Sequence, residues 1–320
     1  QKYSYKHFTG IKSGKTTLIA DIVSCPAILN NYHGRKMIST TSKYYQDING
    51  NTVRETTPVI DWIEKYTEPF GDIQSGGSVA TSAFDLLLNM GCDPIILLGQ
   101  DLAYSGREIH CSGTYHNDDW VPGINRLKNL EMINQNVIRK RKIKYVKQYG
   151  NRDLVISDFV FDLYKSWFED SASRVTVPVI NSTGGGAKID NTKEINLSDS
   201  IKKGKSQTDP AEIIEKLLPY TLHNDITEIK KGMNFGYGII KKLVALTESD
   251  NPDNNDLEYI NNLFKDDEAN SLLNPLMRKS RFYISRHSFD NEKTKGIIYN
   301  EIKVSARKLS RFFERSGLVQ

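Results

Sequence analysis

The feature that most constrains the fold is a glycine-containing loop followed by a helix and a buried strand, all between residues 75 and 101. The loop reads Ser-Gly-Gly-Ser, and its glycines let backbone N–H groups approach a ligand closely. A helix that begins at about Ser78 would direct its unpaired N–H groups and the positive end of its dipole toward the same place. Gly91 ends that helix, the apolar residues after Pro94 predict a short strand, and Asp101 lies where the strand ends. Ligands bind at such strand ends in open α/β sheets, so we predict that an anion binds here.

The composition is that of a globular protein with two domains. The 320 residues are 38% apolar and 26% charged, and no apolar run is long enough to span a membrane. The net charge of +4 suits a phosphate-bearing ligand or an acidic partner. The three cysteines have no CxxC spacing, which argues against a zinc site and a disulfide framework and predicts a cytoplasmic protein. No signal peptide precedes the first predicted strand, and we interpret the chain as a fragment.

Strand and helix patterns alternate over the first two thirds of the chain. They predict strands at 18–23, 35–40 and 177–181, and helices at 26–32, from Pro58, at 126–147 and at 160–168. The lysine-rich polar stretch 198–208 is interpreted as a linker. Beyond it the apolar residues follow helix spacing, as at Ile239, Ile240 and Leu243. We therefore predict an α/β domain over residues 1–206 and a helical bundle over residues 207–320.

Three polar clusters are candidate parts of a binding site. The first offers backbone donors and hydroxyls to a phosphate or a ribose, and consists of Ser75, Gly76, Gly77, Ser78 and Thr81. The second follows the predicted strand and contains Gly99, Gln100, Asp101, Tyr104, Ser105 and His110. In the third, a strand breaks into a glycine loop that holds Asn181, Ser182, Thr183, Gly184, Gly185, Gly186, Ala187 and Lys188. Each cluster also has an explanation without a ligand. The first can be a turn with a satisfied helix cap, His110 of the second can be an ordinary hydrogen-bonding histidine, and the third can be a flexible turn.

Three other patterns are set aside. Residues 13–16 imitate the end of a P-loop, but Gly10 is one position too close and no apolar strand precedes it. The basic run 139–144 lacks interleaved aromatic residues and lies in the predicted long helix, so we predict a solvated face and no nucleic-acid binding. The acidic pair 118–119 beside His116 has no second spaced cluster, so it is a weak signal for a metal; we predict that no metal is essential, and a bound magnesium stays open.

Four segments together resemble the motility accessory factor (Maf) family, whose members are flagellin glycosyltransferases. The segments are SGGSVAT, GCDPIILLGQDLAYSG, HCSGT and VINSTGGGAKI, in that order within residues 1–200. The resemblance implies a Rossmann-like, sialyltransferase-type fold for the first domain. Similar proteins carry a glycine-containing strand, turn and helix upstream of the position where this chain begins, so we expect residues 1–206 to lack the N-terminal part of that domain.

The resemblance also implies a reaction. We expect a pseudaminic- or legionaminic-type nonulosonic acid to be transferred from its CMP ester to serine or threonine hydroxyls of flagellin, a step needed for flagellum assembly and motility. The partners are then CMP-nonulosonic acid as the donor and flagellin as the acceptor protein. No cofactor is required, because CMP is a good leaving group once its phosphate is protonated or hydrogen-bonded.

Roles for single residues follow from the same resemblance. The first cluster, with Gly99 and Gln100, would bind the nucleotide, and the residues that would bind the rest of the donor are Asn181, Thr183, Gly185 and Lys188. Asp101 would hold a hydroxyl or orient a base, Tyr104 would donate to the departing phosphate, and His110 is the candidate general acid–base group. The base histidine of similar sialyltransferases lies much further downstream, where this chain has none. Many relatives also have an acid where this chain has Gly184, so a carboxylate role is lost there.

Two other functions stay open. A related archaeal family that transfers diphosphate to a hydroxymethylpterin shares the glycine loop and the Gly-x-Asp core, but lacks the TGGGAKI segment and the long helical tail. The second alternative is a non-catalytic flagellin-binding assembly factor that keeps the fold without turnover.

Overall fold

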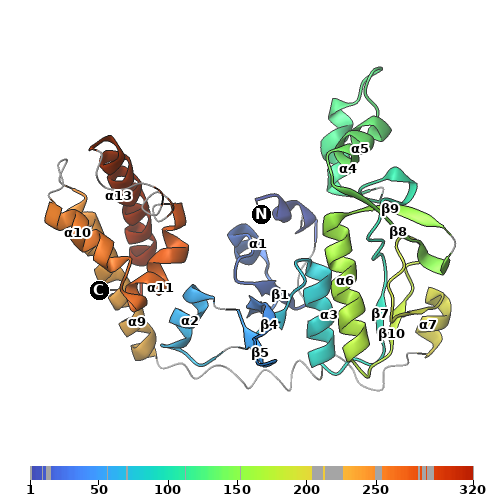
Figure 1. The fold of residues 1–320 in the computed structure, drawn as a ribbon, viewed down its shortest axis with the longest axis horizontal. Coiled ribbons are helices and arrows are strands. Elements are labelled where there is room, and N and C mark those ends of the chain that lie inside the picture. The colour runs from blue at the N-terminus through green and yellow to red at the C-terminus, as the bar shows by residue number, and fades with distance from the viewer. Residues whose placement is uncertain are drawn as a thin grey trace. The chain divides into compact units, whose positions relative to one another are not determined.

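The protein is a mixed α/β molecule with small sheets and a helical C-terminal region (Figure 1). The computed structural model describes residues 2–8, 10–11, 16–55, 57–69, 71–111, 113–151, 153–203, 212, 226–248, 254–279, 282, 286 and 292–319. The chain forms two compact units, which we name unit 1 (Gln1–Arg54 with Gly71–Glu212) and unit 2 (Glu55–Phe70 with Ile213–Gln320). The predicted α/β class and the helical C-terminal region are confirmed. The Rossmann-like assignment stays a prediction, because the described strands form sheets of only two or three strands.

The largest sheet of unit 1 carries the candidate site. Its strands β11 (Lys193–Glu194), β10 (Val179–Asn181) and β7 (Ile95–Leu97) lie in that order and are all parallel. The helices α3 (Val79–Asn89) and α6 (Phe159–Arg174) pack on it. The shared core includes Phe84, Ile95, Leu97, Phe168, Val179, Ala187 and Ile189. Because the strands are parallel, their carboxyl ends lie at one edge, and the loops after β7 and β10 leave from that edge together.

The N-terminal part of unit 1 consists of short strand pairs. The parallel strands β1 (Leu18–Asp21) and β2 (Lys36–Ser39) are connected through α1 (Pro26–Asn31), which confirms the elements predicted at 18–23, 26–32 and 35–40. Two further strand pairs complete this part, namely the parallel pair β3 (Thr41–Ser42) with β6 (Ile73–Gln74) and the hairpin of β4 (Tyr44–Gln46) with β5 (Thr52–Arg54).

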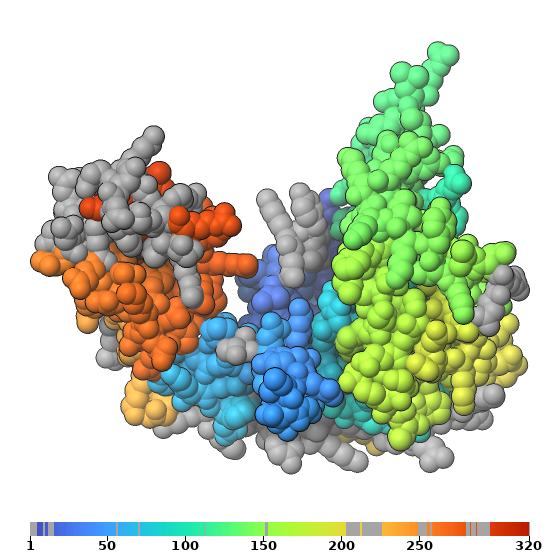
Figure 2. All heavy atoms as spheres, in the orientation of Figure 1, coloured from blue at the N-terminus to red at the C-terminus, as the bar shows by residue number. Residues whose placement is uncertain are grey.

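The long helix predicted at 126–147 is wrong. The structure has α5 (Leu130–Arg139) followed by β8 (Ile143–Lys147), which pairs antiparallel with β9 (Leu154–Asp158). Val146 is buried and lies opposite Val155, and such β-branched cross-strand pairs stabilise a sheet. The segment from η2 (Ser105–Arg107) through α4 (Tyr115–Trp120) and η3 (Val121–Gly123) to α5 stands out from the body of unit 1, in green in Figure 2.

Unit 2 is helical. Its elements are α2 (Pro58–Glu64), α9 (Ile226–Leu246), α10 (Asn254–Leu263), α11 (Asp267–Leu276) and α13 (Glu292–Arg315). The core contains Ile240, Leu243, Leu273, Ile298 and Ile302, all fully buried. Unit 2 differs from the predicted domain 207–320 because it includes α2. Trp62 of α2 is buried in this core, and Tyr66 packs against Gly232 and hydrogen-bonds to Glu268.

The polar stretch 198–208, interpreted as a linker, is helical at its start, since α7 spans Leu197–Lys203. The rest of that stretch lies outside the described residues. Within the part of the chain that the structure describes, no helix has the length and apolar character needed to cross a bilayer.

Candidate functional site

The loops that follow β7 and β10 are bonded to each other at the carboxyl edge of the sheet. The backbone N–H of Gln100 donates to Thr183 Oγ1 at 3.1 Å, and the N–H of Ala187 donates to the Asp101 backbone oxygen at 2.7 Å. The N–H of Ser182 donates to the Leu97 backbone oxygen at 2.8 Å. Two of the three clusters predicted from the sequence, those at 99–101 and 181–188, are therefore brought together.

Gly186 allows the two loops to approach this closely. It has a φ of +76°, and a Cβ built on it would lie 2.2 Å from the Asp101 backbone oxygen, so a side chain cannot fit. Gly184 has a φ of +79° with open space around it, and Gly185 has open space and no positive φ. The sequence prediction selected Gly185, whereas the contact with Asp101 depends on Gly186.

Two residues on neighbouring strands of this sheet, the buried Asn181 and the half-buried Glu194, carry buried polar atoms. Asn181 is fully buried, and its Oδ1 accepts the Thr183 N–H at 3.1 Å while its Nδ2 has no partner among the described residues. Glu194 lies opposite Asn181 in the β10–β11 register. Its Oε2 accepts the Gly150 N–H at 3.0 Å, and its buried Oε1 likewise has no partner in the described part of the chain. Leaving a buried polar atom without a partner costs about 1–3 kcal/mol, and a water or a hydroxyl group would satisfy each of these two atoms.

The sequence analysis missed Glu194 and its neighbour Tyr149. Tyr149 donates its hydroxyl to the Asn181 backbone oxygen at 3.3 Å, and burial together with the charge of Glu194 raises the pKa of Tyr149. The sequence signal that could have identified Glu194 is its position as an acid at the end of a strand, the same signal that identified Asp101. The strand β11 has only two residues, both charged, so no apolar pattern revealed it.

Asp101 presents a carboxylate to this edge. The residue is partly exposed, and the hydrogen bond that it accepts from Ala187 goes to its backbone oxygen, which leaves the carboxylate available for a ligand. The carboxylate can accept hydrogen bonds from a ligand hydroxyl or take a proton from it. Of the three predicted catalytic residues, Asp101 is the one that this edge supports.

Tyr104 is held inside the unit. Its side chain is buried, and its hydroxyl donates to Asp158 Oδ2 at 2.5 Å. Burial first, and then the hydrogen bond to Asp158 and its charge, raise the pKa of Tyr104. The other oxygen of Asp158 caps α6 by accepting from Val160 N and Phe161 N at 2.8 and 2.9 Å. In this geometry the Tyr104 proton is bonded to Asp158, and the role of Tyr104 as a donor to a departing phosphate stays a prediction.

The first glycine loop satisfies its own hydrogen bonds. Thr81 Oγ1 accepts from the N–H groups of Gly76 and Ser78 at 3.0 and 3.3 Å, and Ser75 Oγ accepts from Gly77 N at 3.1 Å. Ser78 caps α3 through Ala80 N at 3.1 Å, so the predicted helix start at about Ser78 is confirmed. The geometry matches the structural alternative, a turn with a satisfied helix cap, and an anion bound here would have to replace these bonds.

Packing explains the glycines of this loop. A Cβ on Gly76 would lie 2.4 Å from Trp167 of α6, and one on Gly77 would lie 3.3 Å from Tyr164 of the same helix. Gly77 also has a φ of +97°. The close approach that the sequence suggested is therefore an approach to α6 in this structure.

His110 belongs to a cluster of aromatic rings on the projecting segment. Its ring stacks on His116 with a centroid distance of 4.1 Å and an interplanar angle of 6°, and His7 of η1 (Lys2–Phe8) packs edge-on against Tyr115 at 4.5 Å. Lys6 pairs with Asp119 at 2.6 Å across the same contact. Within the described residues, no group of three or more His, Cys, Asp or Glu side chains is arranged to hold a metal ion.

We expect the histidine cluster to loosen in acid. Burial first, and then the like charges of His116 and His7, lower the pKa of His110, and burial and His7 also lower the pKa of His116, against the opposing effect of Asp119. A histidine with a lowered folded-state pKa contributes stability above about pH 6.5, and that contribution is lost as the pH falls toward the folded-state pKa. Titration of the histidine ring protons by NMR checks this. A midpoint for His110 at or above the free value would contradict it, and His110→Phe should reduce the acid sensitivity.

The fold and these contacts define a mixed α/β protein whose candidate ligand edge lies at the carboxyl ends of β7 and β10. Residues 1–107 match the family model described as 6-hydroxymethylpterin diphosphokinase MptE-like. The match includes the loop at 75–81 and the residues at 99–104, and ends before His110 and the segment 181–188. No curated protein and no solved structure was found to match the chain. The family description supports a transferase-like function.

Proposed function

We propose that the chain is a transferase that binds a phosphate-bearing, nucleotide-linked donor at the carboxyl edge of β7 and β10. The observation that carries the proposal is the joining of the two strand-end loops through Gln100, Thr183, Ala187 and the Asp101 backbone. Carboxyl edges of parallel strands are where α/β proteins bind such ligands. The family description of residues 1–107 names a diphosphate transferase, which also supports a phosphate-bearing substrate.

The more specific part of the proposal is a donor that is a nonulosonic acid linked to CMP and an acceptor that is a flagellin hydroxyl. The segment VINSTGGGAKI supports this, because it supplies both β10 and the loop that contacts Asp101. The unpaired polar atoms of Asn181 and of the half-buried Glu194 suit a ligand that is rich in hydroxyl groups.

The reaction is a displacement at the anomeric carbon of the donor. The acceptor oxygen forms a bond to that carbon while the bond to the CMP phosphate oxygen breaks, and the departing CMP carries the electron pair. The carboxylate of Asp101 holds the acceptor hydroxyl or takes its proton. Backbone N–H groups of the glycine loop at 184–186 stabilise the charge that develops on the phosphate.

Diphosphate transfer from ATP is the second candidate function. The family description favours it, since the match covers the residues at 75–81 and 99–104. The glycine segment at 183–189 and most of unit 2 lie outside the matched residues, and these features favour the glycosyltransferase.

Calorimetric titration of the chain with CMP, UMP and ATP tests the proposal. Selective binding of CMP supports it, and preference for ATP supports diphosphate transfer. Binding of none of the three would contradict both functions and favour a flagellin-binding factor. Asp101→Ala should lower turnover by about 10²–10⁴-fold, as for loss of a general base. The exposed Asp118→Ala is the matched control for the loss of one carboxylate.

A further inference from the structure

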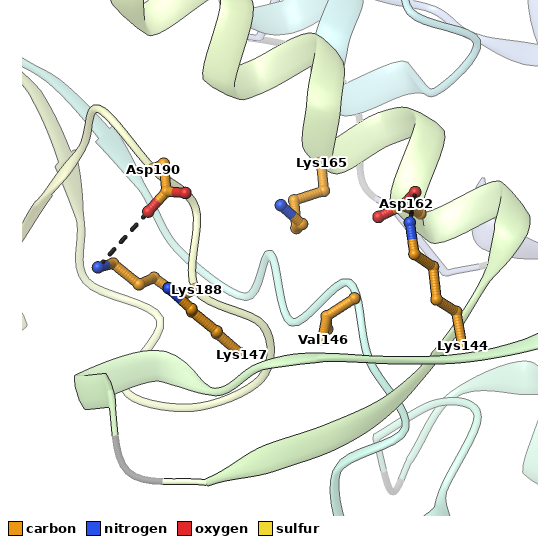
Figure 3. Close-up of a pocket in the computed structure, with 7 residues that line it drawn as sticks. All are labelled: Lys144, Val146, Lys147, Asp162, Lys165, Lys188 and Asp190. Atoms are coloured by element: carbon orange, nitrogen blue, oxygen red, sulfur yellow. Dashed lines mark hydrogen bonds and ion pairs between the residues drawn. The ribbon is translucent and has the colours of Figure 1, made fainter.

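A pocket of about 220 Å³ opens in unit 1 between β8, α6 and the segment that follows the glycine loop (Figure 3). Its charged lining consists of Lys144, Lys147, Lys165, Lys188, Asp162 and Asp190. Lys188 entered the sequence analysis as a candidate ligand residue, whereas the other three lysines did not. We propose that this pocket binds a phosphate group.

The lysines converge from three separate segments of the chain. Lys144 and Lys147 come from β8, Lys165 from α6, and Lys188 from the segment after Gly186. The Lys188 backbone N–H donates to the Lys147 backbone oxygen at 2.8 Å, which fixes that segment against the end of β8. Figure 3 shows the Lys144–Asp162 pair at one end of the pocket, the Lys188–Asp190 pair at the other and Lys165 between them.

The pocket has more positive than negative charge. Ion pairs join Lys144 to Asp162 at 2.5 Å, Lys165 to Glu169 at 2.6 Å and Lys188 to Asp190 at 3.5 Å. The lining therefore has four ammonium groups and two carboxylates, and a third carboxylate, that of Glu169, pairs with Lys165 from outside the lining. Each ammonium has three N–H donors, so a lysine that pairs with one carboxylate keeps donors for a further oxygen.

Burial strengthens the attraction for an anion. The side chains of Lys165 and Lys188 are 15% and 26% exposed, so water screens their charges less than on an open surface. The buried Val146 lies at the base of the pocket and provides no competing charge. An ion with several oxygens and two or more negative charges can contact several of these lysines at once.

The residue type points to phosphate. Lysine presents a compact charge with rotatable donors and binds phosphate as a point charge, whereas planar carboxylates are better matched by the fork of arginine. The lining has four lysines and no arginine. Lys188 lies two residues after Gly186, so a phosphate held here would also fix the segment that contacts Asp101.

Calorimetric titration with pyrophosphate and with orthophosphate, at low and at physiological salt, tests the pocket. Lys147→Gln and Lys188→Gln should each weaken pyrophosphate binding about tenfold, the loss expected for one charge-assisted hydrogen bond. Lys140→Gln, an exposed lysine at the end of α5, removes the same charge outside the pocket and should change the affinity little.

A change of the opposite sign makes the test sharper. Asp162→Asn and Asp190→Asn remove carboxylates that compete for Lys144 and Lys188, so both should tighten pyrophosphate binding. Circular dichroism and thermal melting establish that every variant is folded. Absence of pyrophosphate binding to the unaltered chain would overturn the proposal. Equal weakening of pyrophosphate binding by Lys140→Gln and Lys147→Gln would also overturn the proposal.

The pocket and the proposed function can fail separately. Pyrophosphate has no nucleoside, so its binding with no response to CMP would keep the pocket and contradict the CMP-dependent function. Selective CMP binding that is unchanged in Lys147→Gln, without pyrophosphate binding, would keep the function and overturn the pocket.

Discussion

Replacing Gly186 by alanine is expected to destabilise the folded protein by about 2–5 kcal/mol. Two effects add. A non-glycine residue at a φ of +76° is strained by about 1–2 kcal/mol, and its Cβ would lie 2.2 Å from the Asp101 backbone oxygen, so the two strand-end loops would have to separate. Urea denaturation followed by circular dichroism measures the loss. We also expect the variant to lose donor binding, since the Ala187–Asp101 hydrogen bond cannot form with the loops apart.

The neighbouring glycines provide matched controls. Gly185 has open space around it and no positive φ, so Gly185→Ala should change the stability little. Gly184 has open space around it but a φ of +79°, so Gly184→Ala should lower the stability only by the backbone strain of about 1–2 kcal/mol. The destabilisation is therefore expected to increase from Gly185→Ala through Gly184→Ala to Gly186→Ala. If Gly186→Ala cost no more than Gly184→Ala, the close contact with Asp101 would be wrong.

Asp158→Ala should destabilise unit 1 by about 2–5 kcal/mol. The substitution removes the cap of α6, worth about 1–2 kcal/mol, and leaves the buried Tyr104 hydroxyl without its acceptor, which costs about 1–3 kcal/mol more. Asp158→Asn keeps an oxygen for the cap and should cost less. Tyr104→Phe keeps the cap and should cost about 1–3 kcal/mol, because it leaves one buried carboxylate oxygen unpaired.

A double-mutant cycle isolates the hydrogen bond between these two residues. The double variant should lose less stability than the sum of the single variants, and strict additivity would contradict a direct contact. The raised pKa of Tyr104 adds a pH dependence. The contribution of the hydrogen bond is fully present below about pH 10, the ordinary tyrosine pKa, and is lost as the pH rises through the folded-state pKa. Phenolate absorbance in the unaltered protein and in Tyr104→Phe measures that titration.

Local patterns predicted the elements around the candidate site well. Ser78 as the cap of α3, the short apolar strand β7 before Asp101 and the strand β10 before the glycines are all present. Each depends on residues within about ten positions, where capping, strand and glycine preferences act directly. The strand-end positions of Asp101 and Thr183 follow from these elements, and their proximity follows from parallel pairing.

The partners of single side chains could not be predicted in the same way. Tyr104 was assigned to a phosphate, yet its hydroxyl reaches Asp158, 54 positions along the chain. The basic run 139–144 looked like a solvated helix, but its last two residues begin β8, a strand in which only Val146 is buried, so no alternation of buried and exposed residues marks it. The strand became recognisable only through its pairing with β9, and the lysine pocket depends on that pairing together with α6 and the segment at 188. Such contacts depend on the tertiary fold and leave no periodic signal in the sequence.

The place of α2 in unit 2 has a consequence for the biosynthesis of the protein. Residues 55–70 leave the ribosome before most of unit 1, but the helices that bury Trp62 are translated only after unit 1. About 200 residues separate α2 from α11, which corresponds to roughly 10–40 s of translation. During that interval the apolar face of α2 has no core to enter, so the nascent chain exposes a segment that chaperones recognise. A polypeptide that is cut before the C-terminal helices retains the same exposed face permanently.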